Sequence, residues 1–521
     1  MTRNTIINMK KLLFSLITGM MITVPADAQL LRTTVVQGEI EGVEHQGHAL
    51  YKNIPYAEVP VGDLRWKAPV AKKPWTGVYK ADKWGDRPPQ PNDPNNNGGG
   101  LPISEDCLYL SVETPAKSTA ERLPVFVMIH GGGFATGSYS GTQESFVQDG
   151  IVYCSIEYRL GVLGFMAHPE LSKESPRGIS GNYGILDQIM ALQWIHDNIA
   201  QFGGDPEKIT IAGESAGGIS VSMLCASPLC KGLFRAAISE SGSSFWPVSN
   251  DRGGNTAMVT AKAAEQVGVA FQKQLGKKNL KQLRKLPYEE LVKQQGNGMG
   301  QFWPVVDGYA ITDDQYKLYE NGQYNDVNVL IGTNSDEGAM FSRPAAVADY
   351  EQRVRDSYGD FANRMLKLYP ATNEQEVYYA SSDIFRDGSF AWGTYAWANL
   401  QTKTGKSRVY MYYFDQNSKN TIMPSFRGGA THVAEMPFFY GYKFGSGEMT
   451  NTELRMQQMI TRYIMNFTKT GDPNGEGLPY WTTYEQGKPT VMIMREGLHL
   501  DKVQNQPQMD FFEDFFKSRR Q

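Results

Sequence analysis

The segment with the clearest potential for chemistry is Gly213-Glu214-Ser215-Ala216-Gly217. The apolar run Lys208–Ala212, which we expect to be a strand, precedes it, and a run with helical character, Ala216–Ala226, follows it. A serine flanked by glycines at a strand-to-helix turn is typical of a nucleophile elbow, because the sharp turn exposes the hydroxyl at the carboxyl end of a sheet. We therefore predict that Ser215 is a nucleophile; a purely structural glycine turn is the alternative.

A serine hydroxyl needs a base to take its proton, and histidine is suited to this because it titrates near neutral pH. Elbow serines are followed along the chain first by the acid and then by the histidine. Of the 7 histidines, only His432 and His499 follow Ser215. His432 lies in a glycine-containing loop after the predicted strand Arg408–Phe414, whereas His499 is near the chain end. We predict His432 as the base.

The acid that orients the imidazole should follow a strand between Ser215 and His432. The predicted strand Val327–Gly332 leads into a polar segment that contains Asp336 and Glu337. Spacing does not choose between these two carboxylates, and Asp307 and Asp415 are further candidates.

Donors for a developing oxyanion are expected in His130-Gly131-Gly132-Gly133-Phe134, which follows the predicted strand Leu123–His130. Glycines allow backbone N–H groups to approach a negative charge without interference from side chains. The N–H of Ala216, next to the serine, would be a further donor at a helix N-terminus. A glycine turn without such a role is the alternative.

The elements that must position these residues alternate between strand and helix. Further buried strands are expected at Ile151–Glu157 and Ala236–Glu240, and amphipathic helices at Asp187–Ala200 and Glu453–Phe467. This alternation predicts an α/β fold with helices on both sides of a mostly parallel sheet. We expect a surface loop at Arg87–Leu101 and a helical excursion at Ala257–Met299. No linker divides the chain, so residues 29–521 are predicted to form one domain.

Composition excludes several classes of protein. The chain has 521 residues, of which 41% are hydrophobic and 20% are charged, as in ordinary globular proteins. Its net charge of −4 and the lack of basic runs argue against nucleic acid as a partner. The body of the chain has no apolar stretch of about 20 residues that could span a bilayer.

The N-terminus has the features of a secretory signal. Basic residues precede the short apolar run Leu12–Val24, and Ala26 and Ala28 are the small residues that a signal peptidase requires. We predict cleavage after Ala28 and a secreted or periplasmic protein. An uncleaved membrane anchor is the alternative.

The four cysteines are Cys107, Cys154, Cys225 and Cys230. Cys107 and Cys154 lie in apolar surroundings and are expected to be buried thiols. Whether Cys225 and Cys230 form a disulfide stays open. No cysteine–histidine spacing suggests a metal site, and the chemistry above needs no cofactor.

Blocks along most of the chain resemble the type-B carboxylesterase/lipase family, which includes para-nitrobenzyl esterases and cholinesterases. The similar blocks are Glu105-Asp106-Cys107-Leu108-Tyr109-Leu110, Glu157-Tyr158-Arg159-Leu160-Gly161, Gly181-Asn182-Tyr183-Gly184, Gln201-Phe202-Gly203-Gly204-Asp205-Pro206, Gly213 to Gly218, Pro304-Val305-Val306-Asp307-Gly308 and Thr470-Gly471-Asp472-Pro473-Asn474. The resemblance implies an α/β-hydrolase fold. Two departures are Val433, where the family often has glycine, and Cys107, which has no upstream cysteine with which to pair.

The resemblance also implies roles for residues. It assigns the catalytic acid to Glu337, the histidine to His432 and the oxyanion donors to Gly132, Gly133 and Ala216. Glu214 and Ser241 match positions near this triad; for Ser241 a turn-capping role is an equal alternative.

The expected function is hydrolysis of a small carboxylic ester by an exported serine esterase, without stable membrane insertion and with no prediction of oligomeric state. Alternatives are a lipase on longer chains, a peptidase on the same fold, or a non-catalytic binding protein. Aromatic residues near the motifs either line an apolar pocket or pack in the core: Phe134, Phe302, Trp303, Phe341, Trp392 and Trp397.

Overall fold

The computed structural model describes residues 30–91, 100–138, 141–250, 258–296, 300–441 and 447–520. The predicted signal segment, residues 1–28, lies outside the described residues. Among the residues that are described, no helix combines the length and the apolarity needed to cross a membrane.

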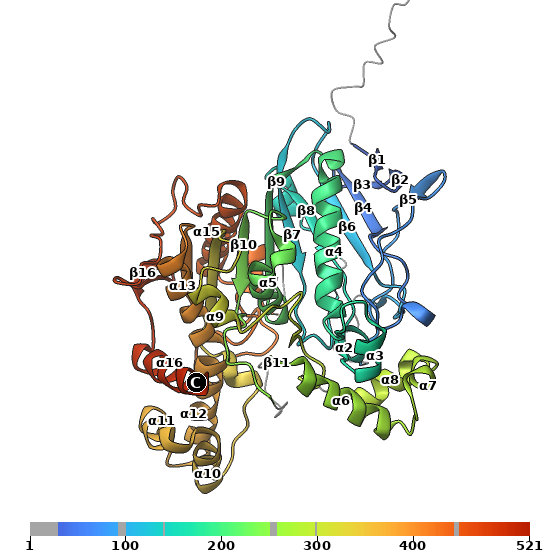
Figure 1. Ribbon diagram of the computed structural model, residues 1–521. Helices are drawn as coiled ribbons and strands as arrows, with labels where there is room; N and C mark the ends of the chain where they lie inside the picture. The colour runs from blue at the N-terminus through green and yellow to red at the C-terminus, as the bar shows by residue number, and fades with distance from the viewer. Residues whose placement is uncertain are drawn as a thin grey trace, which may run out of the picture.

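A large mixed sheet runs through the centre of the molecule (Figure 1). Within the described residues it has eleven strands. In spatial order they are β16 (Leu498–Lys502), β15 (Thr490–Met494), β14 (Val409–Phe414), β13 (Asn328–Asn334), β10 (Ala236–Glu240), β9 (Gly204–Glu214), β7 (Leu123–Ile129), β8 (Val152–Ile156), β6 (Tyr109–Thr114), β4 (His48–Pro55) and β3 (Val43–His45). The strands from β15 to β8 are parallel, and those at both edges are antiparallel. The predicted fold class is therefore confirmed.

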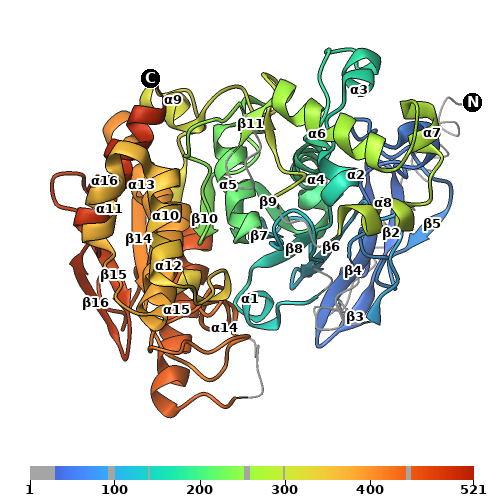
Figure 2. The ribbon, with the colours of Figure 1, turned by 90° about the horizontal axis from the view of Figure 1, so that it is seen from below.

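Both faces of the sheet are apolar, because alternate residues of each central strand enter different cores. On β7, Val125 and Val127 belong to the core that contains α4 (Tyr183–Asn198) and α5 (Ala216–Ala226). Phe126 and Met128 belong to the opposite core, which contains α15 (Asn451–Thr470). Helices therefore cover both faces (Figure 2).

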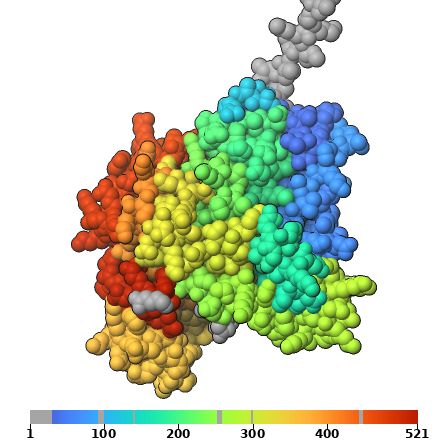
Figure 3. Space-filling model, in the orientation of Figure 1, coloured from blue at the N-terminus to red at the C-terminus, as the bar shows by residue number. Residues whose placement is uncertain are grey.

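The remaining elements surround this sheet. Small sheets are formed by β1 (Arg32–Val35), β2 (Gly38–Glu41) and β5 (Val78–Lys80), and by β11 (Val259–Thr260) with β12 (Val305–Val306). The other helices are α1 (Glu144–Gln148), α2 (Gly161–Phe165), α3 (Pro169–Glu174), α6 (Ala261–Gln274), α7 (Leu280–Arg284), α8 (Tyr288–Gln295), α9 (Gln315–Glu320), α10 (Val347–Tyr358), α11 (Ala362–Leu368), α12 (Glu374–Arg386), α13 (Trp392–Thr404), α14 (Met436–Tyr440) and α16 (Gln506–Arg519). Helices α6 to α8 form the predicted excursion. In the space-filling view, the segment that contains α10 to α12 and the C-terminal helix α16 form adjoining parts of one side of the molecule (Figure 3).

Two predictions about local structure need correction. The strand expected at Lys208–Ala212 is longer, since β9 spans Gly204–Glu214 and ends directly before Ser215. The loop expected on the surface at Arg87–Leu101 begins with a buried stretch, and Arg87 and Gln90 are each only 6% exposed. The physical reason is that Gln90 is hydrogen-bonded to the chain that follows β7.

All four cysteines are buried free thiols, including Cys225 and Cys230. Burial raises the pKa of Cys107 and of Cys225 well above the usual value, so these thiols stay protonated and unreactive.

The ion pair between Arg159 and Asp187 joins the segment after β8 to α4. The Arg159 Nε and Nη2 atoms donate to the Asp187 carboxylate at 2.8 and 2.7 Å, and both side chains are buried. Breaking such a pair on one side leaves an uncompensated charge in the interior.

We predict that Asp187→Asn lowers the free energy of unfolding by about 3–5 kcal/mol because Arg159 loses its counter-charge. The matched control is Glu39→Gln, which breaks the exposed pair of Arg32 and Glu39 and should cost less than about 1 kcal/mol. Denaturant titration measures both. A loss below 1 kcal/mol for Asp187→Asn would contradict the assignment.

Candidate active site

Ser215 occupies a strained turn between β9 and α5. Its backbone has φ 56° and ψ −122°, which a residue with a side chain rarely adopts. Close packing explains the neighbouring glycine, since a Cβ on Gly217 would lie 2.2 Å from the carbonyl oxygen of Ile129. The turn is fixed by the Ser215 N–H, which donates to the Glu240 carbonyl at 2.9 Å. The side chain of Ser215 is consequently held at the carboxyl end of β9.

The structure brings His432 and Glu337 to this serine. The distance from His432 Nε2 to Ser215 Oγ is 2.9 Å, and that from His432 Nδ1 to Glu337 Oε2 is 2.6 Å. A short parallel bridge between Asp336 and Thr431 joins the segments that follow β13 and β14. The next residue of each segment, Glu337 and His432, therefore lie side by side although 95 residues separate them.

Glu337 is buried, and the carboxylate oxygen that does not face His432, Oε1, accepts two hydrogen bonds. Oε1 accepts hydrogen bonds from the Ser241 hydroxyl and from the Asn334 N–H. Ser241 thus holds the carboxylate in place, which answers the alternative that it only caps a turn. These bonds leave Oε2 directed at the imidazole.

The other carboxylates considered from the sequence point elsewhere. Asp336 accepts from Ser382, Ser425 and Arg427. Asp415 pairs with Arg495 at 3.1 Å.

Asp307 accepts from Asn182 Nδ2 at 2.9 Å. The other late histidine, His499, is exposed on β16, where it is paired with Ile493. Among these candidates, His432 contacts Ser215 and Glu337 contacts His432.

Val433, directly after the histidine, has φ 67°. This left-handed conformation is unfavourable for a β-branched residue and costs glycine nothing, which accounts for a glycine preference at such a position. The surrounding structure therefore holds the His432 segment under backbone strain.

The glycine loop after β7 lies against the serine. A Cβ on Gly131 would lie 3.3 Å from the Ser215 Cβ, so these two backbones are in close contact. Gly132 and Gly133 have φ of 100° and 61° and are half-exposed. Within the described residues, the N–H groups of Gly132, Gly133 and Ala216 have no protein acceptor. These donors are therefore available to a ligand beside the hydroxyl.

Gln90 fixes the far end of this loop. Its Nε2 donates to the Gly137 carbonyl at 2.8 Å, and its Oε1 accepts from the Gly137 N–H at 3.0 Å. No local pattern marks Gln90, because it lies in a segment rich in proline and asparagine, which is usually a surface loop. A composition signal alone could not have identified it.

Further buried carboxylates surround the histidine. Glu214 Oε1 lies 3.3 Å from His432 Nε2, and Glu435 accepts from Asn334. Burial raises the pKa of Glu214 well above its usual value, and burial next to Glu337 raises the pKa of Glu435 to about 7. Glu435 had no role assigned from the sequence, since nothing in its local pattern marks a buried carboxylate.

These carboxylates raise the pKa of His432. Burial disfavours the imidazolium, but the carboxylates of Glu214 and Glu337 outweigh burial and raise the pKa of His432 to about 9. Glu214 and His432 each stabilise the charged form of the other.

Aromatic rings pack against the imidazole and against each other. Phe390 stacks on His432 with a centroid distance of 4.9 Å, and Phe341 meets it edge-on at 5.4 Å. Phe385 stacks on Phe341 at 4.6 Å. Phe341 was a predicted pocket residue, whereas Phe385 and Phe390 were missed.

The other predicted pocket residues are buried. Trp392 and Trp397 pack in the core against Phe516 and Phe245, respectively. Phe134 packs on Trp303 at 4.7 Å, directly after the glycine loop, and Phe302 packs on Phe271.

We predict that Glu214→Gln lowers the pKa of His432, because the imidazolium loses the carboxylate that stabilises its charged form and that it stabilises in return. A neutral imidazole is needed to activate Ser215, so the acid limb of the labelling rate of Ser215 by a fluorophosphonate should move to lower pH. The exposed Glu374→Gln should leave this limb in place. An unchanged or upward-shifted limb in Glu214→Gln would contradict this prediction.

Comparison with known proteins identifies the family to which the chain belongs. Residues 28–512 match the model of the carboxylesterase family. The chain is 30% identical to the para-nitrobenzyl esterase of Bacillus subtilis (strain 168) over 515 residues, which cover 93% of this chain and 98% of the relative. It is 30% identical to the fumonisin B1 esterase of Sphingopyxis macrogoltabida over 486 residues, covering 88% and 85% of the two chains.

A solved structure of a PNB esterase covers 92% of this chain and 99% of its own, with a TM-score of 0.78 and 30% identity. This likeness identifies the fold as that of the α/β hydrolases. The chain therefore belongs to the carboxylesterase family and is a carboxylic ester hydrolase.

Proposed function

We propose that Ser215, His432 and Glu337 form the catalytic triad of this esterase and that hydrolysis proceeds through an acyl-enzyme. The observation that carries the proposal is the continuous chain of hydrogen bonds from the Ser215 hydroxyl through both ring nitrogens of His432 to Glu337. Each side chain comes from a different strand end, so their convergence is a property of the fold.

In the first half of the reaction, Ser215 Oγ attacks the ester carbonyl carbon while His432 Nε2 takes the hydroxyl proton. Glu337 accepts the Nδ1–H and stabilises the imidazolium that forms. The N–H groups of Gly132, Gly133 and Ala216 bind the oxyanion of the tetrahedral intermediate. The imidazolium then gives its proton to the leaving alcohol, and the acyl group stays on Ser215.

In the second half, His432 takes a proton from water, whose oxygen attacks the acyl-enzyme. Collapse of the second tetrahedral intermediate returns the proton to Ser215 and releases the acid. Phe341 and Phe390, which pack against the imidazole, favour a substrate with an apolar or aromatic group next to the ester.

We predict that Ser215→Ala lowers kcat/KM for a p-nitrophenyl ester at least about ten-thousandfold, because water must then attack without a covalent intermediate. Glu337→Gln should lower it about ten-thousandfold, because the amide no longer stabilises the imidazolium. Initial-rate assays on purified protein measure both.

The matched control is Ser118→Ala, which alters an exposed serine far along the chain from the elbow and should keep the wild-type rate. Circular dichroism checks that each variant is folded. A folded Ser215→Ala protein that hydrolyses the ester at the wild-type rate would refute the triad. Amide analogues of the same esters separate an esterase from a peptidase.

We also propose that the enzyme is exported and that its signal is removed after Ala28. The support is the basic start, the apolar run and the alanines at 26 and 28. Intact-mass analysis of protein from the periplasm or medium of a secreting host should give a chain that begins at Gln29. Replacing Ala26 and Ala28 with leucine should block cleavage, and a wild-type chain that keeps residues 1–28 would contradict export with cleavage.

A further inference from the structure

The loop that carries two of the proposed oxyanion donors is held from the side of its carbonyl groups. A trans peptide places its C=O and its N–H on opposite sides, so a fixed carbonyl also fixes the direction of the N–H in the same peptide. His130 Nδ1 lies 2.9 Å from the Gly131 carbonyl oxygen, and because a carbonyl only accepts, Nδ1 carries the proton and donates. This bond fixes the peptide whose N–H belongs to Gly132.

The donor at Gly133 is held in the same way. The Gly132 carbonyl accepts a hydrogen bond from the Ala135 N–H at 3.1 Å. It also accepts from the N–H and the hydroxyl of Thr136, at 3.0 and 3.1 Å. These bonds fix the peptide whose N–H belongs to Gly133. Both donor directions therefore depend on residues 135–137 staying packed against residues 130–132.

Gly137 covers the hydrogen bond between His130 and Gly131. A Cβ on Gly137 would lie 2.4 Å from His130 Nδ1 and 2.5 Å from the Gly131 carbonyl oxygen, so the Gly137 backbone packs directly on the two atoms that form this bond. The φ of Gly137, 115°, lies in the region that favours glycine. The position of Gly137 therefore controls the space in which the His130 ring and the Gly131 carbonyl meet.

The side-chain amide of Gln90 holds Gly137 in this position. Gln90 Nε2 donates to the Gly137 carbonyl at 2.8 Å, and Gln90 Oε1 accepts from the Gly137 N–H at 3.0 Å. The segment that carries Gln90 is itself anchored, because the Arg87 N–H donates to the Pro102 carbonyl and the Arg87 carbonyl accepts from the Ser104 N–H. The buried amide therefore ties Gly137 to a fixed part of the chain.

Other contacts restrain the His130 ring without involving the backbone of Gly137. Tyr158 stacks on the ring with a centroid distance of 4.3 Å and donates its hydroxyl to the His130 carbonyl at 2.8 Å. His130 Nε2 lies 3.5 Å from a carboxylate oxygen of Glu157. Within the residues that the structure describes, Gln90 is the side chain that forms hydrogen bonds with Gly137.

We propose that Gln90 is a positioning residue for the oxyanion hole: through Gly137 it keeps the bond between His130 and Gly131 in place and so directs the Gly132 N–H. The proposal rests on the proposed function, because the oxyanion forms only when Ser215 attacks the ester. Loss of the Gln90 amide should lower kcat much more than it raises KM, since the donors bind the oxyanion more strongly than the ester carbonyl of the ground state.

The experiment compares the wild-type protein with Gln90→Met, which keeps the length of the side chain and removes its hydrogen bonds. Initial rates on a p-nitrophenyl ester should show kcat lowered about tenfold to a hundredfold and KM changed by less than about threefold, because a misplaced donor loses much of its effect on the transition state. Gln90→Asn keeps a polar amide but is one methylene too short to span both groups of Gly137. It should show the same split, and it serves where Gln90→Met does not fold.

A trifluoromethyl ketone separates the direction of the donors from a general loss of structure. Ser215 Oγ adds to the ketone carbon, the hydroxyl proton passes to His432, and the carbonyl oxygen becomes an oxyanion at the donors. The matching trifluoromethyl carbinol forms no such bond. In the Gln90 variants the inhibition constant of the ketone should rise by the factor by which kcat/KM falls, while that of the carbinol stays at the wild-type value.

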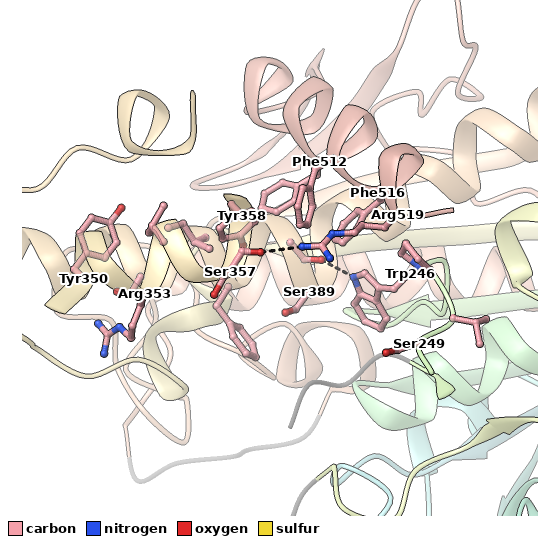
Figure 4. A pocket seen from close by; sticks show the side chains of 18 of the residues that line it. Trp246, Ser249, Tyr350, Arg353, Ser357, Tyr358, Ser389, Phe512, Phe516 and Arg519 are labelled. Carbon is pink, nitrogen blue, oxygen red and sulfur yellow. Dashed lines mark hydrogen bonds between the residues drawn. The ribbon is translucent and has the colours of Figure 1, made fainter. Parts of the chain in front are cut away.

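Two control variants remove side-chain hydrogen bonds to the backbone elsewhere. Gln401→Met replaces a buried glutamine that accepts from Trp397 and donates to the Val327 carbonyl at 2.7 Å. Arg519→Gln acts in the cavity between α10, α12 and α16, where Arg519 donates to the Ser357 carbonyl at 3.2 Å (Figure 4). Both controls should keep the wild-type kcat and the wild-type inhibition constant of the ketone.

A folded Gln90 variant that keeps the wild-type kcat and ketone affinity overturns the proposal. Equal weakening of the ketone and the carbinol also overturns it, because the pocket as a whole has then changed. Ser215→Ala tests the proposed function separately, since it should lose both hydrolysis and the ketone adduct. If it keeps both, the triad itself is wrong, whereas their loss together with an unaffected Gln90 variant rejects only the role of Gln90.

Discussion

The turn at Ser215 is the constraint on which the rest of the structure depends. The strand β9 must stop at Glu214 and the helix α5 must begin at Ala216, so one residue reverses the chain at φ 56°. Such a turn fits only where neighbouring backbone can approach without side chains, since a Cβ on Gly217 would lie 2.2 Å from the Ile129 carbonyl oxygen. Because the hydroxyl is fixed by this turn, the histidine and the carboxylate must come to it.

The second constraint on the site is the charge buried around His432. Ser215 meets an imidazole that is buried with several carboxylates, and their charge raises the pKa of His432 to about 9 despite its burial. The segments that carry these groups are fastened to each other, since Asn334 bonds Thr431 and Arg427 bridges Asp336 and Asp383. The cost of burying like charges is offset by this network of hydrogen bonds and ion pairs.

Specificity is expected from elements outside the sheet. Helices α10 to α12 and α16 pack at one side of the molecule, as Figures 1 and 3 show, and α12 supplies Phe385, which stacks on Phe341 beside the histidine. The sheet and its strand ends carry the proposed catalytic residues, whereas these helices lie outside the sheet beside them. The division is physical: a strained strand–helix turn tolerates little change, while surface-packed helices can exchange side chains with smaller effects on stability.

The sequence by itself determined the alternation of strands and helices, the elbow, the glycine loop and the order of serine, acid and histidine, because these are local patterns of turn chemistry and periodicity. It left Asp336 and Glu337 equivalent until a family resemblance was added. The tertiary structure decided between them through the bridge of Asp336 to Thr431, which turns the next residue toward the imidazole. Gln90, Phe390 and Glu435 gain their positions in the same way, through contacts between residues far apart in the chain, which no local pattern encodes.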